Sequence, residues 1–169
     1  MTSQPEIGVS RFRSDEAGRV TADALQAWHR EGLLVIEDFA SLDQCRQLIS
    51  AADALVEDFD EEEVAAIFST TSQQHAASEY FETSGDKIRC FFEEGAFDST
   101  GKLVVPKSKS INKIGHALHD LNPVFECFSY QPRLANLVTQ LGISEPQWLQ
   151  SMLIFKQPAI GGEVTWHQD

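Results

Sequence analysis

Residues 164–169 hold the residue types and spacing that best suit metal chemistry. On a β-strand, side chains two positions apart point to the same face, so the imidazole of His167 and the carboxylate of Asp169 could chelate one ion. A nitrogen and an oxygen ligand together suit Fe(II), and two histidines with one carboxylate form the facial triad of non-haem iron oxygenases. The sequence shows no second histidine at a matching position, so the triad is incomplete within this chain.

A chance pair is the competing interpretation of this motif. Five histidines in a chain with 26 acidic residues produce the His-x-acid spacing by composition alone. His29-Arg30-Glu31 has the same spacing, but it lies in a predicted helix. Positions i and i+2 of a helix are separated by about 200°, so His29 and Glu31 cannot share an ion. Only the pair at His167 and Asp169 stays a metal-site prediction.

His116 and His119 form a second candidate, because residues three apart share one face of a helix. No cysteine or acidic partner follows them at the spacing of a zinc site. The sequence therefore favours a hydrogen-bonded pair of histidines over a metal site.

Composition limits the classes of partner. The chain has 169 residues, 42% of them hydrophobic, which is enough for one domain with a core. The net charge of −13 repels phosphate backbones and anionic lipid, so we expect no nucleic-acid or membrane partner. Three scattered cysteines fit a reducing compartment and no disulfide framework. Without a secretory signal or a membrane-spanning run, a soluble intracellular protein is expected, in the cytoplasm first and with the peroxisome left open.

The N-terminal elements follow from capping signals. Residues 1–20 are polar and predict a mobile leader. Residues 22–31 predict a helix that Thr21 caps and Gly32 ends, followed by a short buried strand over 33–36. Ser41 and Gln44 have capping-box spacing and open a helix of about four turns. Its apolar stripe contains Cys45, Leu48, Ile49, Ala52, Leu55, Val56 and Phe59.

The second half of the chain mixes helices and strands. Residues 87–93 and 103–105 predict strands, with a turn at 98–101 between them. Residues 112–118 predict the start of a short helix, and two more helices open with proline at 123–130 and 132–141. Residues 147–156 are β-like, and the turn at 158–162 leads into the strand of His167. Helices first and strands last indicate an α+β fold.

Several unrelated segments, taken in order over residues 24–169, resemble the phytanoyl-CoA dioxygenase family. The resemblance covers the N-terminal half of that family. The segments are Trp28-His29-Arg30-Glu31-Gly32-Leu33, Ser84-Gly85-Asp86-Lys87-Ile88-Arg89, Phe91-Phe92-Glu93, Ser110-Ile111-Asn112-Lys113-Ile114-Gly115-His116, Asn122-Pro123-Val124-Phe125, Gln150-Ser151-Met152, Gly161-Gly162-Glu163 and His167-Gln168-Asp169.

The resemblance implies a fold, an activity and a set of site residues. Residues 21–169 would be the N-terminal portion of a double-stranded β-helix, a jelly-roll barrel that needs about eight strands when complete. The activity would be that of an Fe(II)- and 2-oxoglutarate-dependent hydroxylase, with molecular oxygen and a small-molecule substrate as reaction partners. His167 and Asp169 would bind the iron. Lys113, Met152 and Gln168 would lie beside the 2-oxoglutarate.

The same resemblance implies that two further site residues, a distal histidine and an arginine, lie beyond residue 169. Residues 1–169 alone are therefore expected to be inactive. The alternative is a noncatalytic relative that acts as a protein-interaction module. The primary substrate and the oligomeric state are left open by the sequence.

Overall fold

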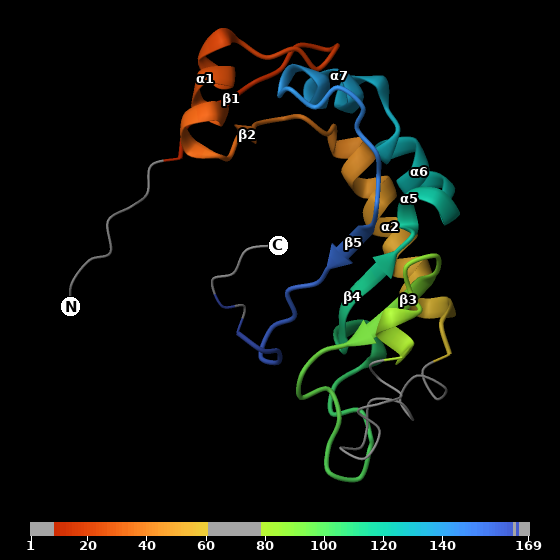
Figure 1. Cartoon of the computed structure of the whole chain (residues 1–169). Coiled ribbons are helices and arrows are strands. Elements are labelled where there is room, and N and C mark those ends of the chain that lie inside the picture. Colours follow the sequence, from red (N-terminus) through yellow and green to blue (C-terminus); the bar gives the residue numbers. More distant parts are fainter. Residues whose placement is uncertain (1–8, 61–78, 164, 166–169) are drawn as a thin grey trace, which may run out of the picture. The chain divides into compact units, whose positions relative to one another are not determined.

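The computed structural model describes residues 9–60, 79–163 and 165 (Figure 1). The chain divides into two compact units, one of Met1–Cys45 with Phe128–Gln147 and the other of Arg46–Cys127 with Trp148–Asp169. The division falls inside helix α2 (Leu42–Asp58), after its first turn.

The first unit contains a short parallel sheet and two helices. Strand β1 (Arg11–Phe12) pairs with β2 (Val35–Ile36) in parallel. Helix α1 (Ala22–Glu31) has the predicted bounds. The Thr21 hydroxyl accepts a hydrogen bond from the backbone N–H of Ala24, and Gly32 ends the helix at φ 71°. Helix α7 (Pro132–Gln140) opens with proline, as predicted.

Residues 9–20 make specific contacts within this unit. Besides forming β1, the segment supplies Ser14, whose hydroxyl accepts a hydrogen bond from Arg133 at 2.9 Å. The backbone N–H of Val20 donates to the Gln140 side chain at 3.1 Å. Residues 9–20 of the expected leader therefore form a strand beside β2 and hydrogen bonds with α7. The domain boundary at residue 20 stays a prediction.

The capping box of α2 is confirmed. The Ser41 N–H donates to Gln44 Oε1 at 2.9 Å, and the Gln44 N–H donates to Ser41 Oγ at 3.1 Å. Ala52 and Val56 of the predicted stripe are buried in the core of the second unit. Ile49 is 60% exposed, so the buried stripe is narrower than predicted.

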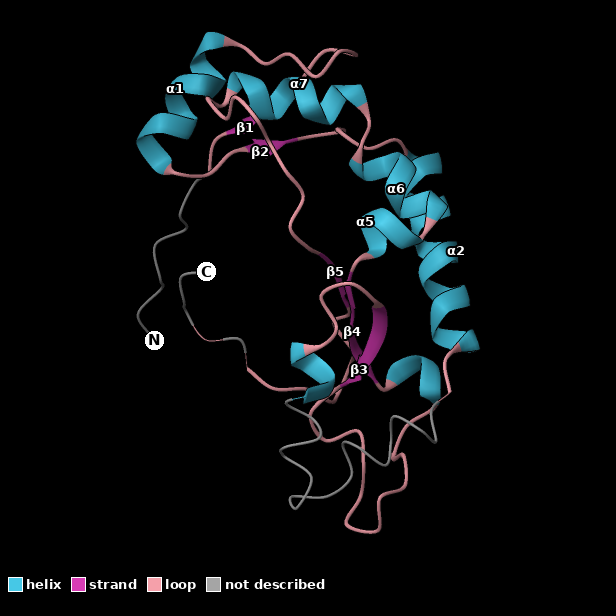
Figure 2. Ribbon diagram, turned by 45° about the vertical axis from the view of Figure 1, so that its right-hand side comes forward, coloured by secondary structure: helices cyan, strands magenta, loops and turns pink. Residues whose placement is uncertain are grey.

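The second unit is built on a three-stranded antiparallel sheet in the order β3-β4-β5, with α2 beside it (Figure 2). Its strands are β3 (Ile88–Phe92), β4 (Ile111–His116) and β5 (Ser151–Ile154). The register shifts between Phe91 and Phe92, which pair with Lys113 and Ile111, so Asn112 is the extra residue of a β-bulge. Apolar side chains of α2, β3 and β4 share one core cluster.

Two predictions for this unit are wrong. Residues 112–118 do not begin a helix, because β4 pairs with strands on both sides and those ladders satisfy its backbone. Helix α5 (Leu118–Leu121) begins only afterwards and is followed by α6 (Pro123–Ser129). Residues 103–105 contribute a single bridge, Phe97 with Leu103, and a 3-10 helix η2 follows at Lys107–Lys109.

The described residues confirm a mixed helix and strand architecture with two small sheets. The strand predicted around His167 lies outside the described residues. Within the described part of the chain, no helix is both long enough and apolar enough to cross a membrane.

Candidate functional site

Lys113 lies in the middle of the three-stranded sheet. It stands opposite Phe91 on β3 and Ile154 on β5, and Gly115 on the same strand stands opposite Met152. Residues directly opposite in antiparallel strands point to the same face, as do residues two apart on one strand. The sheet therefore brings Lys113 and Met152, both predicted cosubstrate residues, to one face.

The Lys113 ammonium is held by aromatic rings. Its Nζ lies 5.0 Å from the ring centre of Phe81 and 5.5 Å from that of Phe91, both within the range of a cation–π contact. Among the described residues, no carboxylate forms an ion pair with this ammonium. The half-buried positive charge is thus available to an anion.

Met152 forms the neighbouring part of this face. Its side chain is 43% exposed, although it sits on a sheet strand. A Cβ added at Gly115 would lie 3.2 Å from Met152 Cγ, so the absence of a side chain at Gly115 leaves room for the methionine. Met152 therefore adds an apolar side chain to the sheet face that carries Lys113.

His116 is buried next to the same aromatic rings. Its ring centre lies 5.2 Å from that of Phe81 and 5.5 Å from that of Phe91. Its Nδ1 is 2.7 Å from the hydroxyl of Ser84, which is fully buried. Burial first, and the charge of Lys113 second, hold the pKa of His116 below its usual 6.5. Both effects favour the neutral imidazole.

His119 is also buried and hydrogen bonded, on α5. Its Nδ1 lies 2.8 Å from the Ser151 hydroxyl, which also accepts the backbone N–H of His119 at 3.0 Å. The predicted hydrogen-bonded histidines are confirmed, with separate serine partners. No group of three or more potential metal ligands occurs among residues 9–60 and 79–163. Ser84, Phe91 and Ser151 belong to segments of the family resemblance, but no local pattern marks them as partners of histidines more than 20 residues away.

His167, Gln168 and Asp169 lie outside the described residues, so their roles stay predictions. The segment that leads to them is anchored along the sheet after β5. The Phe155 N–H donates to the Asn112 carbonyl at 2.7 Å. A Cβ added at Gly161, whose φ is +117°, would lie 2.9 Å from the Glu93 carboxyl carbon.

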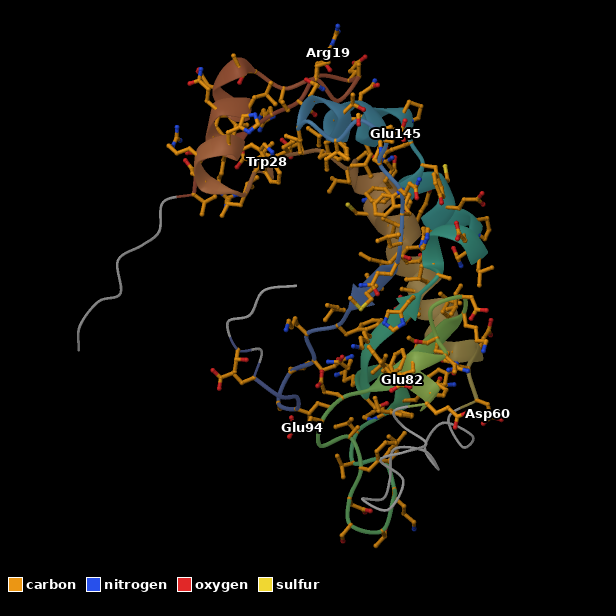
Figure 3. All side chains as sticks on the ribbon, in the orientation of Figure 1. Arg19, Trp28, Asp60, Glu82, Glu94 and Glu145 are labelled. Atoms are coloured by element: carbon orange, nitrogen blue, oxygen red, sulfur yellow. The ribbon has the colours of Figure 1, made fainter. Side chains whose placement is uncertain are left out.

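The adjacent glycine makes an equally close approach. A Cβ at Gly162 would collide with the carboxylate of Glu94, which Figure 3 labels beside the segment that follows β5. The positive φ of Gly161 favours glycine there, whereas the contacts with the two carboxylates involve the ends of flexible side chains, which can move. The structural reason for glycine in this turn is therefore the backbone conformation at Gly161.

Comparison with known proteins gives the family context. Residues 28–169 match the model of the family described as phytanoyl-CoA dioxygenase (PhyH). A phytanoyl-CoA dioxygenase of Arabidopsis thaliana is 50% identical over 152 residues, which cover 90% of this chain and 53% of that protein. Phytanoyl-CoA dioxygenase domain-containing protein 1 of Bos taurus is 45% identical over 150 residues, covering 86% and 52%. Its Caenorhabditis elegans homologue is 44% identical over 149 residues, covering 87% and 52%. The chain spans about half the length of these relatives.

Proposed function

Because the chain belongs to the phytanoyl-CoA dioxygenase family, we propose that the whole protein is an Fe(II)- and 2-oxoglutarate-dependent dioxygenase of the hydroxylase type. The observation that carries the proposal is the family match over residues 28–169. It is supported by the positive charge of Lys113, which forms no ion pair with any carboxylate of residues 9–60 and 79–163. The proposed reaction partners are molecular oxygen and a small organic substrate.

The described residues fit 2-oxoglutarate as a cosubstrate. An ammonium held between aromatic rings, with no carboxylate ion pair in the described part of the chain, suits a dicarboxylate. The apolar Met152, on the same sheet face as Lys113, suits the methylene carbons of the same molecule. Lys113 would bind and orient one carboxylate, and Gln168 would lie near the other end of the cosubstrate.

His167 and Asp169 would hold the iron through one nitrogen and one oxygen atom, and a distal histidine in the rest of the protein would complete the ligand set. When bound, iron would activate molecular oxygen, which is the oxidant: one oxygen atom would hydroxylate a C–H bond, and the other would be taken up as 2-oxoglutarate is converted to succinate and carbon dioxide. The contribution of this chain is to bind the carboxylate, to orient it over the sheet and to limit access of water.

We also propose that β3, β4 and β5 belong to a double-stranded β-helix barrel in the whole protein. The antiparallel order of the sheet supports this, as does the position of β5 at its edge. The apolar Ile154 of this strand is 54% exposed in the described structure. An exposed edge strand is normally covered by further structure.

The test is the replacement of His167 or Asp169 by Ala in the full-length protein. Each change should abolish succinate release from 2-oxoglutarate and leave the circular dichroism unchanged, because a metal ligand is lost without loss of a core side chain. His29→Ala and Glu31→Ala are matched controls, since this pair repeats the His-x-acid spacing on exposed positions of α1. Retained turnover in the His167→Ala protein would overturn the proposal.

A further inference from the structure

The hydrogen bonds of Ser84 determine which nitrogen of His116 carries the proton. The Ser84 hydroxyl donates to the carbonyl of Phe81. A hydroxyl has a single proton, so its oxygen must accept from His116, 2.7 Å away. Neutral His116 therefore carries its proton on Nδ1, and protonation takes place at Nε2.

His116 and Lys113 contact the same two aromatic rings. Phe81 and Phe91 each lie within 5.5 Å of both the His116 ring and the Lys113 ammonium, measured to ring centres. Phe91 is buried, at 4% exposure, and cannot move freely. Because Phe81 is 48% exposed, a displacement of the His116 ring would act on the ammonium mainly through the tightly packed Phe91 ring.

We propose that His116 is a positioning residue for the Lys113 anion site, which supports the ring pair beneath the ammonium and takes up a proton when a dicarboxylate binds there. This inference rests on the proposed function, because it takes Lys113 to be the site of 2-oxoglutarate binding. It adds a residue, and a link between proton uptake and anion binding, to that site.

The direction of the link follows from the charges. In the free protein, the Lys113 charge disfavours protonation of His116 and lowers its pKa. A bound dicarboxylate would add negative charge beside the ammonium and so raise the pKa of His116. By reciprocity, protonation of His116 must strengthen dicarboxylate binding, so affinity should increase as the pH falls through the pKa of His116.

Other charged groups on the elements packed against His116 must be separated from this effect. Arg89 lies on β3, and its guanidinium is engaged by Thr83 and by the Tyr80 ring. Lys87, Glu82 and Asp86 are exposed, and Asp120 follows on α5. All of these groups are unchanged in a His116 variant, so the comparison of pH profiles isolates the imidazole.

The experiment measures 2-oxoglutarate binding to the full-length protein by calorimetry between pH 5.5 and 8.5, with Zn(II) as a diamagnetic metal. His116→Asn is the informative variant, because its amide can still donate to Ser84 but does not titrate. We expect the wild-type affinity to increase about tenfold relative to the variant as the pH falls, because the bound dicarboxylate favours the protonated imidazole. Dividing the wild-type affinity by the variant affinity at each pH removes the effect of metal-ligand protonation, which both proteins share.

A second measurement uses the wild-type protein, so it does not depend on the folding of a variant. Nuclear magnetic resonance of the wild-type protein should show the pKa of His116 rising when 2-oxoglutarate saturates the site. Binding with an unchanged pKa, and with wild-type and His116→Asn profiles that run parallel, would overturn this inference and leave the proposed function standing. No 2-oxoglutarate binding by the wild-type protein would overturn both.

Discussion

At the scale of single residues, Lys113 departs most clearly from what composition suggests. In a chain with 26 acidic and 13 basic residues, a lysine is expected to find a carboxylate. Lys113 instead lies over two phenylalanine rings, and no described carboxylate is paired with it. This arrangement keeps the charge in place without neutralising it.

Lys113→Met in the full-length protein should raise the Michaelis constant for 2-oxoglutarate by about one to two orders of magnitude, because a charge-assisted contact worth about 1.5–3 kcal/mol is lost. The Michaelis constant is measured from steady-state succinate release at varied 2-oxoglutarate concentration. Lys109→Met is the control, since Lys109 is exposed. An unchanged Michaelis constant would show that Lys113 does not contribute to 2-oxoglutarate binding.

Gly115→Ala tests the space beside Met152. The added Cβ would lie 3.2 Å from Met152 Cγ and 3.5 Å from the Ser151 carbonyl oxygen, so the methionine must move. We expect 2-oxoglutarate affinity to fall severalfold and stability to fall by about 1 kcal/mol, as overpacking does. Calorimetry and urea unfolding measure the two effects. Gly85→Ala should change neither, because a Cβ there meets nothing within 4 Å.

The cysteines differ in reactivity. Cys90 is buried in the core cluster, and burial raises the pKa of its thiol to about 11. The reactive thiolate is therefore almost absent at pH 8, whereas Cys127 is exposed. Mass spectrometry after iodoacetamide treatment of the native protein should find Cys127 modified and Cys90 intact. Equal labelling of both would contradict the described burial.

At the scale of elements, the C-terminus of helix α2 is stabilised by a residue that is distant in sequence. Its N-terminus is capped locally by Ser41 and Gln44, but it has no basic residue in its last turn. Lys107 supplies the missing charge from η2. Its Nζ donates to the carbonyls of Glu57 and Phe59 at 2.7 Å each and lies over the Phe59 ring.

Lys107→Met should lower the free energy of unfolding by about 1–2 kcal/mol, because carbonyls at the helix C-terminus lose their cationic donor. Urea unfolding followed by circular dichroism measures this loss. Lys109→Met removes the same charge at the other end of η2 and should have little effect. An equal loss of unfolding free energy in both variants would show that the change in net charge causes the effect, and that the contact of Lys107 with the helix does not.

At the scale of the whole molecule, the chain spans about half the length of its relatives, so the proposed activity is a proposal for the full-length protein. A protein of residues 1–169 alone should bind Fe(II) weakly and release no succinate. The proposed ligands His167 and Asp169 would supply only two donor atoms, which would not fix a reactive geometry. Anaerobic Fe(II) titration with 2-oxoglutarate, followed by addition of oxygen, measures both properties. Tight stoichiometric binding with succinate release would reveal ligands outside the predicted set.

Local signals in the sequence were sufficient wherever the determining interactions are local. Thr21 caps the start of α1 and Gly32 ends it, while Ser41 and Gln44 cap the start of α2. Pro132 begins α7. Each of these signals acts on backbone groups within one helical turn. The order of several short motifs was also enough to identify the family, which the comparisons confirm.

Tertiary structure alone decided the character of β4 and of its site. Histidines at 116 and 119 fit a helical period, but strands on both sides impose an extended backbone on residues 111–116. The bulge at Asn112, the serine partners of the histidines and the rings around Lys113 all come from residues distant in sequence. Residue types predicted which groups could act, whereas strand pairing decided which of them meet, because pairing depends on contacts that no local pattern records.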